Sequence, residues 1–405
     1  MGVERILIIG AGQAGAQAAV SLRQGAYKGA ITIIGAEEAP PYQRPPLSKA
    51  YLKGELDEAR LYLRPAEFYE TQNITLRLGI RATGIDRKAK IVSTDDGEAH
   101  PYDALLIATG APPRRISAPG ADLRGVHYLR TLSDSDSLKP MLAAPGRVVI
   151  VGAGYIGLEV AAVARAAGRE VTVLEMAPRV LARVAGEPVS EFYQTLHLSK
   201  GVDLRLGAAF AAFEGERRLH GARLQDGEVI DCETALVGIG AAPEVTLARE
   251  AGLDIDNGIV VDEYARTSDP AIFAAGDCTN FPSPRYGRRM RLESVPNAIE
   301  QAKAAAANMI GGEVVYDALP WFWSDQYDVK LQTVGLSEGH DELVVRGDPA
   351  ENKFAVWYLK DGKALAVDAI NDPASFAMGK KLIVSGATLD PAKLADRTVD
   401  LKTLA

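Results

Sequence analysis

Two glycine motifs in the chain have the spacing that binds a dinucleotide pyrophosphate. Residues 10–15 read GAGQAG and residues 152–157 read GAGYIG, so G-x-G-x-x-G occurs twice. In this pattern the first glycine makes a tight turn, the second lets the backbone approach the pyrophosphate, and the third lets helix and strand pack closely. These parts fall to Gly10, Gly12 and Gly15 in the first copy and to Gly152, Gly154 and Gly157 in the second.

Each motif lies between a predicted strand and a predicted helix. The branched apolar runs 6–9 and 148–151 are typical of buried parallel strands. The Ala-rich stretches 13–24 and 155–167 predict the helices that follow. A lone glycine motif is weak evidence, but a motif that joins a strand to a helix predicts a dinucleotide site.

A second strand and an acidic residue complete each copy. The strands are predicted at 31–34 and 171–174, and the acids are Glu37 and Glu175. They lie 37 − 10 = 27 and 175 − 152 = 23 residues beyond the first glycine, where the usual spacing is about 20. An acid at this place accepts hydrogen bonds from ribose hydroxyls and repels a 2′-phosphate. Glu175 therefore favours NADH over NADPH, although Arg179 is a nearby cation.

Composition excludes several other classes of function. The 405 residues carry 45 Lys and Arg against 53 Asp and Glu, a net charge of −8, which argues against a general nucleic-acid binder. No stretch is apolar enough to predict a membrane span. The two cysteines, Cys232 and Cys278, are too few for a disulfide framework, a CxxC relay or a cysteine zinc site. The five histidines form no metal-ligand pattern, and the low cysteine count favours the cytoplasm.

The chain changes character near its last quarter. Up to that point, ATG (108–110), GIGAAP (238–243) and IFAAGD (272–277) follow apolar runs that predict strands. From Trp321-Phe322-Trp323 onward, short predicted strands alternate with turns, and a helix is predicted near 373–385. This pattern predicts a separate α+β domain at the C-terminus.

Longer motifs carry a family resemblance. They are PPLSKAYL (45–52), SDPAIFAAGDC (268–278), ESVPNAIEQA (293–302) and PWFWSDQY (320–327). With the two glycine motifs, they make the chain similar to the NADH-dependent, FAD-containing ferredoxin reductases of bacterial oxygenase systems, including cytochrome P450 systems. That family has the glutathione reductase fold. The matching motifs run from residue 10 to residue 327.

The resemblance implies an α/β fold with two Rossmann-like dinucleotide-binding domains and a C-terminal α+β interface domain. The FAD-binding domain would comprise residues 1–112 and 244–318. The NADH-binding domain would be inserted at 113–243, and the interface domain would cover 319–405. The second glycine motif lies wholly inside the predicted insertion.

The resemblance also implies the residues that bind the adenosine half of FAD. The pyrophosphate would lie against the first glycine motif, including Ala14, and the backbone of Ala82 would meet the adenine. The family's ribose-binding acid aligns with Ala36, whereas the carboxylate here is one residue later, at Glu37. Either Glu37 or the backbone of Ala36 would contact the ribose.

Other residues are implied for the rest of the flavin. Arg44 and Arg130 would pair with the FAD pyrophosphate or groups beside it, because a guanidinium matches phosphate geometry. Asp277 would accept hydrogen bonds from the ribityl chain, Val295 would lie against the isoalloxazine, and Trp323 would stack near it.

The catalytic residues implied by the family are Lys49, Glu159 and Trp323. Lys49 would stabilise the negative charge of reduced flavin and pair with Glu159, which would bind the nicotinamide carboxamide. Besides the second glycine motif and Glu175, Tyr155 and Gly240 would line the NADH site, and Tyr155 would cover the flavin until nicotinamide displaces it.

The family's reaction is hydride transfer from NADH to non-covalently bound FAD, followed by single-electron transfer to a [2Fe-2S] ferredoxin that serves a P450 or dioxygenase. We expect an acidic ferredoxin, because Arg285, Arg288, Arg289, Arg291 and Lys303 form a basic cluster in the sequence. The protein would be a monomer or a homodimer, with no nucleic-acid or membrane partner. A rubredoxin reductase and an NADH-sensing flavoprotein of the apoptosis-inducing-factor type remain alternatives.

Overall fold

The computed structural model describes residues 2–404, which form two compact units. Unit 1 comprises residues 2–43 with Asp57–Pro112 and Ala241–Ala318. Unit 2 comprises Arg44–Leu56, Pro113–Gly240 and residues 319–404. The short segment Arg44–Leu56, which holds the whole PPLSKAYL motif, therefore clusters with the second glycine motif and the C-terminal region.

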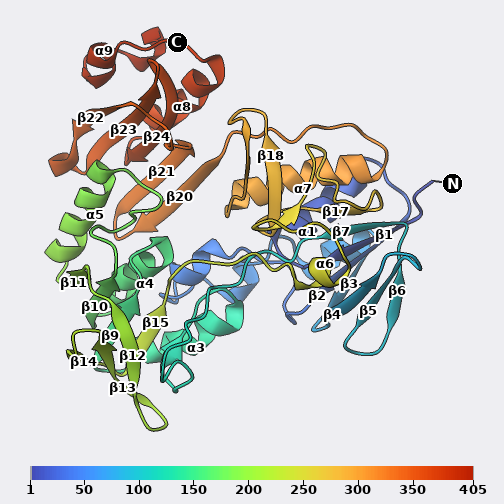
Figure 1. The fold of residues 1–405 in the computed structure, drawn as a ribbon, viewed down its shortest axis with the longest axis horizontal. Coiled ribbons are helices and arrows are strands. Elements are labelled where there is room, and N and C mark those ends of the chain that lie inside the picture. Colours follow the sequence, from blue (N-terminus) through green and yellow to red (C-terminus); the bar gives the residue numbers. More distant parts are fainter. Residues whose placement is uncertain (1, 405) are drawn as a thin grey trace. The chain divides into compact units, whose positions relative to one another are not determined.

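Unit 1 is built on a five-stranded parallel sheet in the order β17-β7-β1-β2-β3 (Figure 1). The strands are β1 (Arg5–Ile9), β2 (Ala30–Gly35), β3 (Ile74–Leu78), β7 (Ala104–Ile107) and β17 (Ile272–Ala274). Helices α1 (Gln13–Gln24) and α7 (Val295–Met309) pack against each other, and their alanines join the sheet's isoleucines in one core. Small side chains on both helices permit this close approach.

The rest of unit 1 consists of short helices and two small sheets. One sheet holds β4 (Ala82–Asp86), β5 (Ile91–Thr94) and β6 (Ala99–Pro101), and the other holds β16 (Ile259–Val260), β18 (Thr279–Ser283) and β19 (Arg288–Met290). The helical pieces are η2 (Glu58–Arg60), α2 (Ala66–Thr71) and α6 (Thr246–Glu250).

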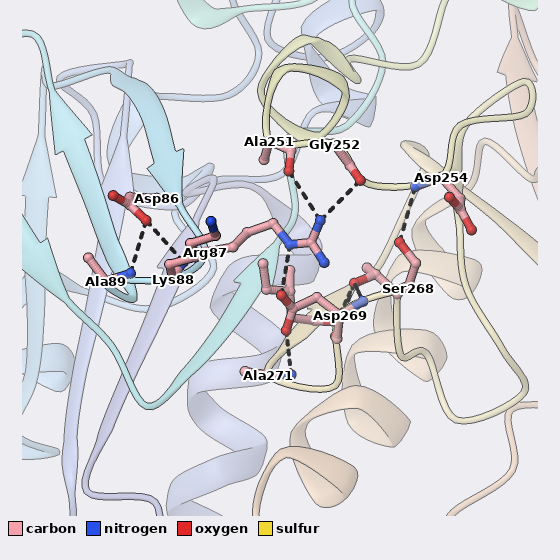
Figure 2. A network of polar contacts seen from close by, with 12 residues as sticks. Asp86, Arg87, Lys88, Ala89, Ala251, Gly252, Asp254, Ser268, Asp269 and Ala271 are labelled. Carbon is pink, nitrogen blue, oxygen red and sulfur yellow. Dashed lines mark hydrogen bonds and ion pairs between the residues drawn. The ribbon is translucent and has the colours of Figure 1, made fainter.

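Arg87 joins sequence-distant parts of unit 1 (Figure 2). Its guanidinium donates to the Asp269 carboxylate at 2.8 Å and to the carbonyl oxygens of Ala251 and Gly252 at 3.3 and 3.1 Å. Asp269 also accepts from the backbone N–H of Ala271 at 3.0 Å. Asp269, the first aspartate of the SDPAIFAAGDC motif, thus helps to connect two segments of unit 1 that are distant in the sequence.

Unit 2 contains a second parallel sheet, in the order β11-β10-β9-β15-β8 (Figure 1). Its strands are β8 (Val126–His127), β9 (Arg147–Val151), β10 (Glu170–Glu175), β11 (Asp203–Leu206) and β15 (Thr234–Val237). Helices α3 (Leu132–Ala143), α4 (Tyr155–Ala166) and α5 (Glu187–Ser199) accompany it, with an antiparallel sheet of β12 (Phe210–Gly215), β13 (Leu219–Leu224) and β14 (Val229–Asp231).

The C-terminal part of unit 2 is an antiparallel sheet in the order β20-β21-β24-β23-β22. Its strands are β20 (Trp321–Gln326), β21 (Val329–Gly335), β22 (Glu342–Asp348), β23 (Lys353–Lys360) and β24 (Lys363–Ile370). Helix α8 (Pro373–Ser385) packs on β21 and β24 over an apolar core, and η3 (Pro349–Glu351), α9 (Pro391–Ala395) and η4 (Leu401–Leu404) complete this region.

These elements confirm the predicted α/β fold with two Rossmann-like halves and a C-terminal α+β part. The predicted strands around both glycine motifs are present within one residue at each end, and the predicted helix at 373–385 is α8. Most of the basic cluster lies in a hairpin, in which β19 pairs antiparallel with β18.

Candidate functional site

The first and third glycines of both motifs are required by the protein itself. Gly10 and Gly152 have φ angles of +114° and +105°, which side chains rarely adopt. A Cβ on Gly15 would lie 1.9 Å from the carbonyl oxygen of Gly10, and one on Gly157 would lie 2.1 Å from that of Gly152. These contacts are with backbone, so no rotamer change would relieve them.

The middle glycines differ, because the protein leaves space beside them. Gly12 and Gly154 have extended backbone, with φ angles of −89° and −79°. A Cβ on Gly12 would meet no atom within 4 Å, and one on Gly154 would meet only the carbonyl oxygen of Gly238 at 3.9 Å. Nothing in the protein therefore demands glycine at these two positions. The open space fits a ligand that lies against the backbone.

Helices α1 and α4 start at this space with uncapped N-termini. Neither Gly12 nor Gly154 supplies a capping side chain, and neither helix has an acid in its first turn. By contrast, α3 is capped by Thr131 and α7 by Ser294. Free N–H groups and the positive end of the helix dipole attract an anion. Both sites fit a dinucleotide pyrophosphate, and Ala14 lies in the first turn of α1.

Glu175 is the last residue of β10 and lies beside the second glycine turn. Its carboxylate accepts from the backbone N–H groups of Ala153 and Ala177 at 2.7 and 2.8 Å. Arg179 does not face outward: its guanidinium donates to the carbonyl oxygens of Ala185 and Ala182 and to Ser190 Oγ. The guanidinium of Arg179 therefore binds the segment between β10 and α5 and the start of α5.

The first unit has no acid at the corresponding place. Strand register pairs Ile9 with Ile34 in unit 1 and Val151 with Leu174 in unit 2. Gly35 therefore takes the position of Glu175, where a Cβ would lie 2.5 Å from that of Ala11. Ala36 follows and is exposed, and the carboxylate of half-buried Glu37 accepts from the Tyr42 hydroxyl.

The other predicted FAD residues of unit 1 lie at the ends of elements. Ala82 begins β4, and Val295 begins α7. Asp277 follows β17 by way of Gly276, whose N–H donates to Gln301 Oε1 at 2.8 Å. Gln301, in the ESVPNAIEQA motif, thus holds the turn that carries Asp277.

Unit 2 contains a buried carboxylate with three donors. Glu159 lies on α4 with an exposed fraction of 2%. Its Oε2 accepts from Lys49 Nζ at 2.6 Å and from Ser48 Oγ at 2.5 Å. Its Oε1 accepts from Ser324 Oγ at 2.6 Å. The expected Lys49–Glu159 pair is therefore present, with a fixed carboxylate orientation.

Three chain segments build this cluster. Ser48 and Lys49 come from the end of η1 (Pro45–Ser48), which packs on α3 and α4. Ser324 comes from β20. Ser48 and Ser324 are not among the residues predicted from the sequence, although each is next to one that is, Lys49 and Trp323. Arg44, before η1, donates to the carbonyl oxygen of Arg130 at 2.8 Å, which brings this predicted pair together.

Aromatic rings gather beside the cluster. The rings of Tyr155 and Phe322 lie 4.6 Å apart between centroids, and those of Trp321 and Trp323 lie 5.6 Å apart. Burial, together with Asp368, raises the pKa of Tyr155 well above its ordinary value. Tyr155 is therefore a neutral phenol at physiological pH. Gly240, with a φ angle of +97°, follows β15 by three residues.

Asp368 is a buried acid in the same unit. Its Oδ2 accepts from the Tyr358 hydroxyl at 2.6 Å, and that hydroxyl oxygen accepts from the Gly186 N–H at 3.0 Å. Burial raises the pKa of Asp368 to about 7, although the Tyr358 hydrogen bond acts in the opposite direction. The carboxyl therefore changes its charge near neutral pH.

We expect Asp368→Asn to stabilise the protein at alkaline pH. The native pKa is about 7 against an ordinary 3.8, so the folded state binds the proton more tightly. In the wild-type protein, the contribution of Asp368 to the free energy of unfolding is therefore full below about pH 4 and is lost as pH rises through about 7. At pH 8 the variant should be more stable by up to about 4 kcal/mol, since each pKa unit is about 1.4 kcal/mol. Denaturant unfolding at pH 5 and pH 8 measures the difference.

Exposed Asp328 gives the control, because Asp328→Asn should leave stability unchanged at both pH values. An Asp368→Asn variant with the same advantage at pH 5 and pH 8 would contradict the assigned titration.

At least three of the five cations in the basic cluster form ion pairs in the structure. Its ion pairs are Arg285 with Asp317 at 3.6 Å, Arg291 with Glu293 at 2.5 Å and Lys303 with Glu300 at 2.7 Å. Arg289 donates to the carbonyl oxygens of Val261 and Asn280. Arg289 thereby holds the β18–β19 hairpin against the strand β16 region.

Cys232 and Cys278 are both buried, and burial raises the pKa of each thiol. Residues 2–404 hold no group of three or more potential metal ligands and no helix long and apolar enough to cross a membrane.

The open spaces beside Gly12 and Gly154, at the N-termini of α1 and α4, are called here the two nucleotide cradles. Together with the Lys49–Glu159 pair, they define a flavin- and nicotinamide-dependent oxidoreductase. The chain belongs to the pyridine nucleotide-disulphide oxidoreductase family, whose model matches residues 4–302, and the reductase C-terminal family matches residues 321–405. In that family FAD and NAD(H) are the cofactors, and both cradles fit them.

Within this family, the chain is similar to ferredoxin reductases over almost its whole length. A probable ferredoxin reductase of Castellaniella defragrans is 46% identical, with 99% of each chain covered. Putidaredoxin reductase of Pseudomonas putida is 44% identical over 99% of this chain and 96% of its own. The solved covalent putidaredoxin reductase–putidaredoxin complex matches with a TM-score of 0.96 and 43% identity, covering 99% of this chain and 98% of that one.

Proposed function

We infer that the protein is an NADH-dependent ferredoxin reductase of an oxygenase system. The observation that carries this inference is the joint presence of two pyrophosphate cradles and the Lys49–Glu159 pair. The similarity to putidaredoxin reductase over almost the whole chain supports it. Hydride uptake from NADH and release of single electrons are the chemistry of bound FAD.

The chain's own residues would bind and orient the two cofactors. We propose that the first glycine motif, Asp277 and Val295 hold FAD, with Arg44 and Arg130 beside its phosphates. Glu159 would accept a hydrogen bond from the nicotinamide carboxamide and so orient the ring. Lys49 would supply positive charge that stabilises the reduced flavin. The three donors on Glu159 keep it fixed for that task.

Anaerobic titration of the purified flavoprotein tests the proposal. We expect stoichiometric NADH to bleach the flavin spectrum, whereas NADPH at the same concentration should do so much more slowly. The reduced protein should then pass electrons to a [2Fe-2S] ferredoxin faster than to rubredoxin. A flavin that NADH does not reduce would overturn the enzyme assignment and favour an NADH-sensing role.

The preference for NADH should depend on Glu175. We expect Glu175→Ala to raise the KM for NADH by about 10- to 100-fold, because the ribose loses its acceptor and Ala153 N–H loses its partner. Activity with NADPH should fall less, since the repulsion of its 2′-phosphate is also removed. Steady-state kinetics with both donors measure the change in preference. An unchanged ratio of the two kcat/KM values would exclude this role.

We propose that the ferredoxin partner is acidic, because Arg285, Arg288, Arg289, Arg291 and Lys303 form a basic cluster in the chain. A ferredoxin KM that rises with ionic strength would support charge-steered docking. We propose a cytoplasmic protein and a monomer or homodimer.

A further inference from the structure

A chain of side-chain hydrogen bonds runs from the C-terminal region to Glu159. Tyr327 OH lies 3.2 Å from His197 Nδ1, and His197 Nε2 lies 2.8 Å from Gln326 Oε1. Gln326 Nε2 lies 3.3 Å from Ser324 Oγ, which donates to Glu159 Oε1 at 2.6 Å. The chain thus passes from the β20–β21 turn through α5 and back to the carboxylate on α4.

The middle of this chain has no access to solvent. His197 and Ser324 are fully buried, and Gln326 is 1% exposed. Buried polar groups need partners because an unmade hydrogen bond costs their full desolvation. Each link in the chain therefore constrains the next. The chain reaches the surface only at half-buried Tyr327.

The chemistry of Glu159 fixes the direction of every bond. An ionised carboxylate can only accept hydrogen bonds, so the Ser324 hydroxyl must donate its single proton to Glu159. Ser324 Oγ can then only accept, which requires the amide nitrogen of Gln326 to face it. The amide oxygen consequently faces His197 Nε2, which must carry a proton. Neutral His197 then accepts at Nδ1 from the Tyr327 hydroxyl.

All four donors therefore point toward Glu159, an arrangement in which each bond polarises the next. Burial also lowers the pKa of His197, which favours the neutral ring that this arrangement requires.

We propose that Ser324, Gln326 and His197 are positioning residues that fix the Glu159 carboxylate for nicotinamide binding. The C-terminal region would thus help to set the geometry of hydride transfer, in addition to contributing to its own fold. The inference rests on the proposed function, because it assigns the chain a task at the nicotinamide.

The kinetic test replaces Ser324 with alanine in the FAD-loaded protein. We expect the limiting rate of flavin reduction by NADH to fall about 10-fold or more, because a misplaced Glu159 carboxylate would orient the nicotinamide less well. Photoreduction of the flavin should be unchanged. Ser324→Thr, which keeps the hydroxyl, should restore most of the rate. Ser375→Ala is the matched control, since Ser375 is also fully buried and donates to a carboxylate, that of Asp372, at 2.6 Å. Equal losses in both alanine variants would overturn the proposal.

A second readout is independent of activity. Nitrogen-15 NMR of histidine-labelled protein, with His197 assigned through His197→Gln, should show a neutral ring protonated at Nε2 that does not titrate between about pH 6 and 8. Ser324→Ala should alter this signal through Gln326. A His197 that titrates normally, or that carries its proton on Nδ1, would overturn the chain even if NADH reduces the flavin. If NADH fails to reduce the flavin while the NMR result holds, the proposed function fails instead.

Discussion

Replacing Glu159 with alanine should lower the rate of flavin reduction by NADH at least 100-fold and also destabilise unit 2. The substitution leaves Lys49, whose side chain is 17% exposed, without its carboxylate, and it removes the acceptor of Ser48 and Ser324. Breaking a buried ion pair costs about 3 to 5 kcal/mol. Residual exposure of Lys49 places the expected loss toward the lower end of that range. Stopped-flow absorbance and denaturant unfolding measure the two effects.

The two effects can be separated with a double variant. Lys49→Met with Glu159→Leu removes both charges, and such apolar replacements are often neutral or stabilising. We expect this variant to recover most of the stability and none of the rate. Glu170→Gln is the control, because Glu170 pairs with Arg147 at the surface, where ion pairs contribute little. A double variant that reduces its flavin at the wild-type rate would show that the pair serves folding alone.

Replacing Gly154 with valine should weaken NADH binding about 100-fold or more, equivalent to about 2.7 kcal/mol, and leave the fold intact. The backbone of Gly154 is extended, and a Cβ would meet only one atom, at 3.9 Å. A side chain therefore fits the protein but occupies the space that the pyrophosphate needs. Calorimetric titration of the oxidised protein with NAD⁺ or a non-reducing NADH analogue measures the loss.

The neighbouring glycine supplies the contrast. Gly157→Val should unfold the nucleotide-binding region, because its Cβ would lie 2.1 Å from the Gly152 carbonyl oxygen. The flavin content of Gly154→Val should match that of the wild type, since its first cradle is untouched. Normal NADH affinity in Gly154→Val would place the pyrophosphate elsewhere.

Local patterns in the sequence determined most of the elements around the two cradles. Apolar runs, Ala-rich stretches and glycine spacing placed β1, α1, β9 and α4 within one residue at each end. These features act over a few residues, through strand burial, helix propensity and the sterics of a tight turn. The structure of the Trp321-Phe322-Trp323 segment is harder to predict. Its bulky rings indicate a change of domain, but they do not indicate the strand β20 that they begin.

The residues around Glu159 and the partners of the arginines follow only from the tertiary structure. Ser48 and Ser324 lie 111 and 165 residues from Glu159 in the chain, so no local pattern could connect either with it. The same holds for His197 and for Asp317, the partner of Arg285. Two nucleotide-binding units and the residue types of the site could be predicted from the sequence, since they depend on short-range geometry. Burial and hydrogen-bond partners depend on contacts between distant segments, and only the folded chain brings those segments together.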